Sequence, residues 1–172
     1  MDIDYQKYIP ANFPDESRVW IYQSNRAFSV FEENELNGIL SNFIAQWNTH
    51  GNEVSGFGHL FFNWFIILMA DETKFGVSGC STDSSIRLIK QIENKFNVQL
   101  LDRLTPAIII ENKILLRPVP EIKKDLAENK ISKNSIYFNN TVLNKKELRE
   151  KWLLTIEQGW LGKKLQLQLQ AH

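Results

Sequence analysis

The run Trp64-Phe65-Ile66-Ile67-Leu68-Met69 is apolar at every position. A strand with one face in water alternates apolar and polar residues, whereas a run that is apolar on both faces is typical of a central, buried strand. We therefore expect this run to lie in the middle of a sheet. The preceding run Val54–Phe62 predicts a second strand. The bend between the two strands stays open, because Asn63 alone is a weak turn former.

Toward the N-terminus, the sequence predicts a strand followed by a helix. Arg18–Gln23 is rich in β-branched and aromatic residues and is bounded by turn formers, as strands are. Ser29 and Glu32 have the spacing of a capping box, in which each side chain satisfies a backbone N–H at a helix start. Apolar residues then recur at helical spacing as far as Gly51, so we expect a helix over about 30–49.

Toward the C-terminus, Ser78-Gly79-Cys80-Ser81-Thr82-Asp83-Ser84-Ser85 joins the strand region to an amphipathic helix, expected over about 82–96. Val98–Leu101 is a short strand candidate. The resulting order is strand, helix, two strands, helix, strand. This order is compatible with a ferredoxin-like βαββαβ-type α/β sandwich, an α+β fold with its helices on one face of an antiparallel sheet.

The last third of the chain predicts a C-terminal α/β extension. Its expected elements are a hairpin of Ala107–Ile110 and Ile114–Arg117, a helix from Pro120 to about Glu128, a strand at Ser135–Phe138, a helix from Asn144 to about Ile156, and a strand or frayed tail at Leu165–Gln170. We therefore divide the chain into an N-terminal arm at 1–17, an α+β core at 18–110, and an extension at 111–172 that packs on the core.

The charged residues cancel, with twenty basic and twenty acidic side chains, which argues against a general nucleic-acid binder. Residues 1–100 hold 7 Lys and Arg against 12 Asp and Glu, which leaves 13 against 8 for residues 101–172. A basic C-terminal third could meet an anionic partner. The Lys residues there are interleaved with Glu and Asp, however, and this favours a mixed, solvated surface.

Cys80 is the only cysteine, so the chain forms no internal disulfide and nothing suggests an oxidising compartment. The acidic start Met1–Tyr5 lacks the apolar segment of a secretion signal, and the run Trp64–Ala70 is too short to span a bilayer. We expect a soluble cytoplasmic protein without a membrane span. The spacings typical of metal ligands are missing, and we predict neither a metal nor a cofactor.

The candidate catalytic residues are Cys80 and Asp83, which stand at the predicted start of a helix. Free N–H groups and the helix dipole would stabilise a thiolate there and lower its pKa. Asp83 would oppose that thiolate, and a lone cysteine is commonly an inert, buried side chain. The neighbouring Ser81 and Ser84 are candidate ligand-binding residues that line an anion pocket, or they only cap the helix.

Further candidate ligand-binding residues are Gln23, Ser24 and Arg26, a polar set directly after the first strand. His59 is the one histidine placed to serve as a base for Cys80, although a structural role within a strand is the alternative. If the first strand neighbours the strand that precedes Cys80, both polar sets share one edge of the sheet. They would then form one pocket.

The strings Arg18–Arg26 and Gly79–Ser85, with Phe65–Leu68 and Asp71-Glu72 between them, resemble a family of uncharacterised bacterial proteins, mainly from Bacteroidetes. Members are often labelled ABC transporter ATPases. Such an ATPase needs Gly-x-x-x-x-Gly-Lys-Ser/Thr to wrap phosphates and hold magnesium. The nearest string, Gly159-Trp160-Leu161-Gly162-Lys163-Lys164, has its glycines too close together and lacks the hydroxyl. The resemblance therefore implies no mechanism.

We carry three functional hypotheses from the sequence. The first is a non-enzymatic cytoplasmic α+β domain that binds a small molecule or a protein partner, including a second copy in a homodimer. The second is an enzyme that uses Cys80 or Asp83 at a helix N-terminus, supported by Arg26, Gln23 or His59. The third is a nucleic-acid adaptor that works through the basic C-terminal third.

Overall fold

The computed structural model describes residues 2–49, 52–53, 55–71 and 79–169. Helices and antiparallel sheets are mixed, which confirms the α+β class. The chain forms two compact units. The N-terminal unit comprises Asp4–Asp102 and Val142–Arg149, and the C-terminal unit comprises Met1–Ile3, Arg103–Thr141 and Glu150–His172. No helix within the described ranges has the length and apolar character needed to cross a membrane.

The N-terminal unit is built on a three-stranded sheet with the order β1-β5-β4. β1 spans Arg18–Gln23, β4 spans Ser55–Phe61 and β5 spans Phe65–Asp71. β1 and β4 both pair antiparallel with β5, so they run parallel to each other with β5 inserted between them. This is the split βαβ arrangement of the ferredoxin-like fold. β5 contains the apolar run that was expected in the middle of a sheet, and it is the central strand.

A tight turn at Phe62 and Asn63 joins β4 to β5. Both residues have left-handed backbones, with φ angles of 54° and 60°, and the Trp64 N–H donates to the Phe61 carbonyl at 3.0 Å. Paired left-handed residues match the twist of hairpin strands, but an aromatic residue rarely adopts this conformation. The turn contains no glycine, so the sequence did not reveal its position.

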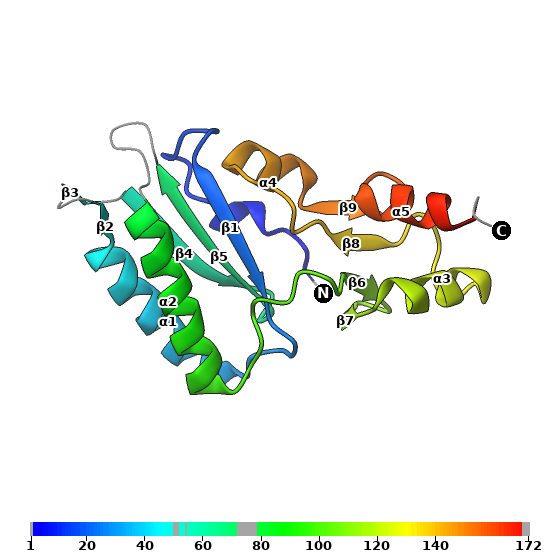
Figure 1. Ribbon diagram of the computed structural model, residues 1–172, viewed down its shortest axis with the longest axis horizontal. Helices are drawn as coiled ribbons and strands as arrows, with labels where there is room; N and C mark the ends of the chain where they lie inside the picture. Colours follow the sequence, from blue (N-terminus) through cyan, green and yellow to red (C-terminus); the bar gives the residue numbers. More distant parts are fainter. Residues whose placement is uncertain (1, 50–51, 54, 72–78, 170–172) are drawn as a thin grey trace. The chain divides into compact units, whose positions relative to one another are not determined.

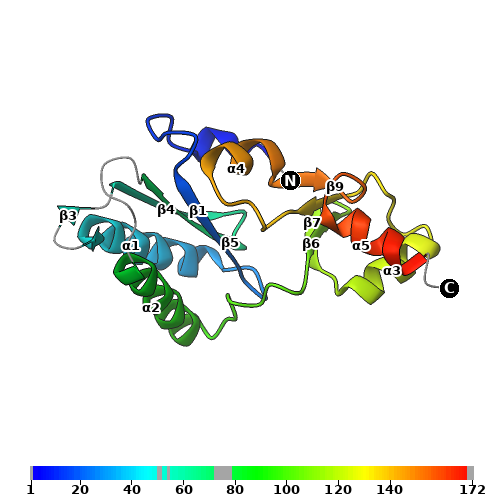
Figure 2. The ribbon, with the colours of Figure 1, turned by 45° about the horizontal axis from the view of Figure 1, so that its top comes forward.

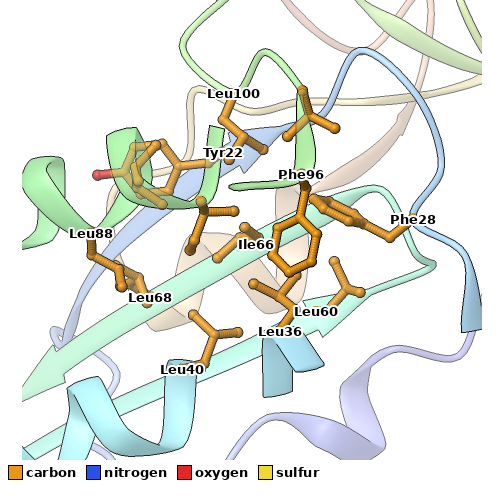
Figure 3. Close-up of a cluster of buried hydrophobic side chains, with 13 residues drawn as sticks. Tyr22, Phe28, Leu36, Leu40, Leu60, Ile66, Leu68, Leu88, Phe96 and Leu100 are labelled. Atoms are coloured by element: carbon orange, nitrogen blue, oxygen red, sulfur yellow. The ribbon is translucent and has the colours of Figure 1, made fainter. Parts of the chain in front are cut away.

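Two antiparallel helices cover one face of this sheet (Figure 1). α1 spans Val30–Gln46 and opens with the expected capping box, since Ser29 and Glu32 each accept the other's backbone N–H. α2 spans Gly79–Phe96 and begins about one turn earlier than expected. The helices and the sheet enclose a buried apolar cluster (Figure 3). Its members are Tyr22, Phe28, Leu36, Leu40, Leu60, Ile66, Leu68, Leu88, Ile89, Ile92, Phe96, Val98 and Leu100.

The opposite face of the sheet is covered by the N-terminal segment, which contains the 3-10 turn η1 at Gln6–Tyr8, and by α4 at Lys145–Lys151 (Figure 2). Side chains alternate along a strand, so Ile67 and Met69 point to this face while Leu68 points to the helices. All three side chains are fully buried. Both faces of β5 are therefore dry, as its sequence requires.

Hydrogen bonds hold the N-terminal segment to α4. The Tyr5 hydroxyl donates to the Leu148 carbonyl at 2.7 Å, and burial raises the pKa of Tyr5 to about 12. The Lys145 ammonium donates to the carbonyls of Ala11, at 3.2 Å, and Phe13. Lys145 is 5 % exposed, so its charge depends on these carbonyls in place of water.

The strand expected at Val98–Leu101 is not formed, and this segment is irregular. The outer edge of β1, where a ferredoxin-like fourth strand would pair, meets a segment from much later in the chain. The Val19 N–H donates to the Leu143 carbonyl at 2.9 Å, and an isolated antiparallel bridge joins Arg18 to Asn144. The candidate strand at Val98–Leu101 therefore adds no fourth strand to this sheet.

The C-terminal unit holds a four-stranded antiparallel sheet with the order β7-β6-β8-β9. The elements of this unit are β6 Ala107–Ile110, β7 Lys113–Leu116, α3 Val119–Ala127, β8 Ile136–Phe138, β9 Leu153–Thr155 and α5 Trp160–Leu169. The two short strands β2 Asn48–Thr49 and β3 Asn52–Glu53 belong to the N-terminal unit, where they pair with each other. The expected hairpin, helix and strand over 107–138 are confirmed. The hairpin lies wholly in this unit, so the division falls at residue 102 rather than 110.

Two expectations for the last thirty residues were wrong. The helix expected from Asn144 to Ile156 ends at Lys151, because the next residues form β9 and pair with β8. Its start is as expected, since the Asn144 side chain accepts the Glu147 N–H at 2.8 Å. The alternating Leu and Gln residues of the C-terminal end form α5 as far as Leu169, with its Leu161 and Leu165 buried one turn apart.

Packing accounts for Gly159, the first glycine of the string that was compared with an ATPase motif. A Cβ atom at this position would lie 1.7 Å from the Tyr137 hydroxyl oxygen, so any larger residue would displace α5 from β8. That hydroxyl lies beside the backbone of Trp160 and Leu161, and burial raises the pKa of Tyr137. The glycine thus serves a close helix–sheet contact.

We predict that Lys145→Met destabilises the protein, because the variant keeps the buried stem but leaves the Ala11 and Phe13 carbonyls without their donor. Losing buried hydrogen bonds to a charged group should lower the free energy of unfolding by about 1–3 kcal/mol, measured by urea denaturation. Lys146→Met, at the exposed neighbouring position, is the matched control and should change little. Equal stability of both variants would contradict the proposed role of Lys145.

Candidate functional site

A groove lies between the second half of α1 and the first half of α2. Its volume is about 370 Å³. The lining residues are Phe43, Gln46 and Trp47 from the end of α1, and Ser84, Arg87, Leu88 and Gln91 from α2. On each helix these residues recur at three- and four-residue spacing, so each set occupies one face. The groove combines an apolar floor with hydroxyl, carboxamide and guanidinium groups.

The floor of the groove is aromatic. The rings of Phe43 and Trp47 lie 5.0 Å apart between centroids with an interplanar angle of 38°, and Trp47 is 2 % exposed. Trp47 also packs on Trp20 of β1, with ring centroids 5.8 Å apart. Gly56 of β4 makes room for it, since a Cβ atom there would lie 2.8 Å from the indole ring. The floor is thus fixed against the sheet.

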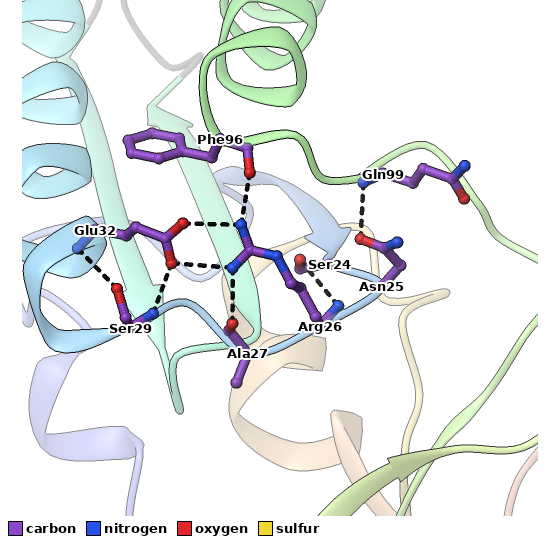
Figure 4. A network of polar contacts seen from close by, with 8 residues as sticks. All are labelled: Ser24, Asn25, Arg26, Ala27, Ser29, Glu32, Phe96 and Gln99. Carbon is purple, nitrogen blue, oxygen red and sulfur yellow. Dashed lines mark hydrogen bonds and ion pairs between the residues drawn. The ribbon is translucent and has the colours of Figure 1, made fainter.

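Arg26, an expected ligand-binding residue, joins three segments at the far end of the two helices (Figure 4). Its guanidinium donates to both carboxylate oxygens of Glu32, at 2.9 and 2.8 Å, and to the Phe96 carbonyl at 2.5 Å. These contacts tie the loop after β1 to the start of α1 and the end of α2. The paired guanidinium lowers the pKa of Glu32 to about 2.

The expected shared pocket of residues 23–26 and 80–84 is not assembled. Arg26 contacts the last residue of α2, whereas Ser84 lies twelve residues earlier on that helix. At 1.5 Å per residue the two positions are about 18 Å apart along the axis. Gln23 and Ser24 are 6 % and 0 % exposed. Both are packed within the sheet unit.

The residues around the start of α2 have different placements. Cys80 belongs to the first turn of the helix, rather than preceding it, and the side chains of Cys80 and Ser81 lie outside the described residues. Asp83 is exposed. Ser85 is buried and its hydroxyl donates to the Thr82 carbonyl at 2.7 Å, a bond made within the helix. Among the expected site residues, Ser84 lines the groove.

His59 lies on the sheet face that points away from the helices. Its neighbour in sequence, Leu60, belongs to the helix-side cluster, so alternation places the imidazole on the other side. There it stacks on Tyr8, with centroids 5.2 Å apart at 23°, and meets Phe61 edge-on at 5.0 Å. Burial lowers the pKa of His59. The structure therefore does not bring His59 and the helix of Cys80 together as base and nucleophile.

Sequence reasoning missed most of the groove. Phe43 and Trp47 belong to the apolar residues that recur at helical spacing before Gly51, and Arg87 and Gln91 resemble the solvated face of an amphipathic helix. Arg87 and Gln91 stand four residues apart, as do Ser84 and Leu88, and this spacing was the available signal. It could not show that α1 faces this stripe, because helix pairing is a tertiary property.

Comparisons of the chain with protein-family models, curated proteins and solved structures found no match. The fold and the groove define an α+β protein with an open groove between α1 and α2, and the chemistry of the lining residues is the guide to function.

We predict that acid lowers the free energy of unfolding of the wild-type protein, because Glu32 becomes protonated. Its carboxyl titrates near pH 2 in the folded chain, against an ordinary value of 4.5, so between these values the unfolded chain binds a proton that the folded chain does not. The free energy of unfolding should therefore fall as pH decreases from about 4.5 to 2. Glu32→Gln should lose this slope and be less stable at neutral pH, as followed by urea denaturation at each pH.

Glu35→Gln is the control for that experiment. It removes a carboxylate from the same helix, where Glu35 pairs with Lys95 at 2.7 Å and both side chains are more than 40 % exposed. Exposed pairs contribute little. An acid slope that persists unchanged in Glu32→Gln would show that other carboxylates cause it.

We predict a second pH effect from His59. Because its pKa in the folded state lies below the ordinary 6.5, the unfolded chain takes up the proton first as pH falls below that value. Wild-type stability should therefore decrease as pH falls through this region, and His59→Phe should flatten that part of the profile. Thermal unfolding between pH 7.5 and 5 measures the difference. Parallel profiles for the two proteins would contradict it.

Proposed function

We propose that the protein is a non-enzymatic binding module whose α1–α2 groove takes a small molecule. The observation that carries this proposal is the groove itself, with an aromatic floor and a few polar groups in about 370 Å³. Protein sites for small molecules occupy about 300–1,000 Å³ and combine apolar with polar lining groups. In this groove four of the seven lining residues are polar. We place the module in the cytoplasm, because a chain with one cysteine forms no internal disulfide.

The enzyme hypothesis has less support. A cysteine nucleophile requires a base within hydrogen-bonding reach, and the histidine considered for that role stacks on Tyr8 on the other face of the sheet. Arg26 is engaged by Glu32 and by the end of α2. The binding proposal needs neither residue at the groove.

The nucleic-acid hypothesis also has less support. Basic residues of the C-terminal unit lie beside carboxylates: Arg117 is 3.3 Å from Asp125, and Lys130 is 2.6 Å from Glu128. Mixed charge of this kind gives a solvated surface and a weak field for phosphates.

Screening a library of small aromatic and aliphatic fragments by ¹H–¹⁵N NMR tests the proposal. We expect binders to shift amide signals of residues 43–47 and 84–91, because these segments line the groove. Ser84→Phe should fill the space and weaken such binders by about tenfold or more, as expected when a ligand loses an apolar pocket.

Ser41→Phe is the matched control, since Ser41 is exposed on α1 and does not line the groove. Its fragment affinities should equal those of the wild type. Dispersed spectra of both variants establish that they fold. The proposal is wrong if no fragment shifts the groove signals, or if Ser84→Phe binds the same fragments equally well.

A further inference from the structure

The charge of the groove points to the kind of ligand it takes. Among the described residues, its lining includes one guanidinium, that of the exposed Arg87, and no carboxylate. None of the ion pairs formed by the described residues includes Arg87. A guanidinium presents paired N–H groups that match the two oxygens of a carboxylate. An anionic ligand would therefore find its counter-charge there.

The floor points to a flat ligand body. Phe43 presents an aromatic ring, the nearly buried ring of Trp47 lies beneath it, and Leu88 adds an apolar side chain that is 5 % exposed. Aromatic surfaces bind other flat rings by offset or edge contacts, which contribute beyond the area that is buried. A ring that rests on this floor would place its substituent toward the polar rim.

The rim supplies donors and acceptors as well as charge. The carboxamides of Gln46 and Gln91 lie on opposite helices, and a carboxamide has both an N–H₂ group and a carbonyl oxygen. Ser84 adds a hydroxyl. Such groups select the orientation of a ligand without adding charge, so Arg87 is the lining residue that distinguishes an acid from its neutral analogue.

Asp83 modulates this charge. It stands four residues before Arg87 on α2, a spacing at which opposite charges attract each other on a helix surface. The ion pairs of the described residues include none between these two side chains, and Asp83 does not line the groove. Its negative charge still lowers the local potential felt by an incoming anion.

We infer that the groove binds a small organic acid with a flat ring, whose carboxylate pairs with Arg87 while its ring rests on Phe43 and Trp47. This inference rests on the proposed function, because it names the ligand class of the same groove.

Three probes separate the contributions of charge and shape. They are naphthalene-2-carboxylate, its neutral analogue naphthalene-2-carboxamide, and cyclohexanecarboxylate, which keeps the charge but lacks the flat ring. Titrations followed by ¹H–¹⁵N NMR should show the aromatic acid binding about tenfold tighter than the amide, as expected for one charge-assisted hydrogen-bonded pair. It should also bind tighter than cyclohexanecarboxylate, which keeps the charge but lacks the aromatic contacts.

Arg87→Gln should remove the preference for the acid over the amide, while the amide keeps its affinity. Lys90→Gln, which removes an exposed positive charge from the same helix outside the groove lining, should keep the preference. Asp83→Asn should strengthen binding of the acid and leave that of the amide unchanged.

The outcomes distinguish this inference from the proposal beneath it. If the amide binds as tightly as the acid, or if Arg87→Gln affects both equally, the ligand class is wrong and the groove still binds small molecules. If neither aromatic probe shifts the groove signals while other fragments do, the class is again wrong. If no molecule shifts the groove signals, both the ligand class and the proposed function are wrong.

Discussion

The structure depends on the need to cover both faces of β5. Phe65 to Ala70 are fully buried, so this strand has no side that can face water. α1 and α2 cover one face, and the N-terminal segment with α4 covers the other. Burial of an apolar side chain from water contributes about 1.5–3 kcal/mol, and six consecutive residues make this strand the strongest single constraint on the fold. A ferredoxin-like sheet with only one covered face would not satisfy it.

The helix pair on the first face is held unequally at its two ends. At one end Arg26 binds Glu32 and the Phe96 carbonyl, and the rings of Phe28 and Phe96 meet edge-on at 5.7 Å. At the other end, bulky rings fill the space beneath the helices and a groove remains between them. Arg26 of the polar set after β1 thus helps to fix the helices at one end, whereas the groove lies toward the other end.

Local signals in the sequence predicted the parts of the fold that depend on local chemistry. The capping box at Ser29 and Glu32 placed the start of α1, and the uninterrupted apolar run identified the central strand. The edge of β1 could not be predicted, because its partner Leu143 lies more than a hundred residues away in the chain. Val98 and Leu100 have the alternating apolar pattern of a strand, and both are buried in the helix-side core. The backbone there is nevertheless irregular and forms no strand.

The site followed the same division. Ser84 was a candidate because of its place near a helix start, a local feature, whereas the groove that it lines depends on the pairing of two helices. Arg87 carries no local mark that separates it from other exposed basic residues on α2. Its significance comes from Phe43 and Trp47 across the groove, and neither the composition nor the spacing of a single helix reveals that neighbour.

The insertion of Arg103–Thr141 between two parts of the N-terminal unit has a consequence for biosynthesis. Chains emerge from the ribosome with the N-terminus first. When Asp102 has emerged, the sheet and both of its helices are present, but α4 and the edge segment at Val142–Arg149 have not yet been made. The nascent chain must therefore carry a partly uncovered apolar sheet face through the synthesis of some forty further residues, an interval in which chaperones would find a binding surface.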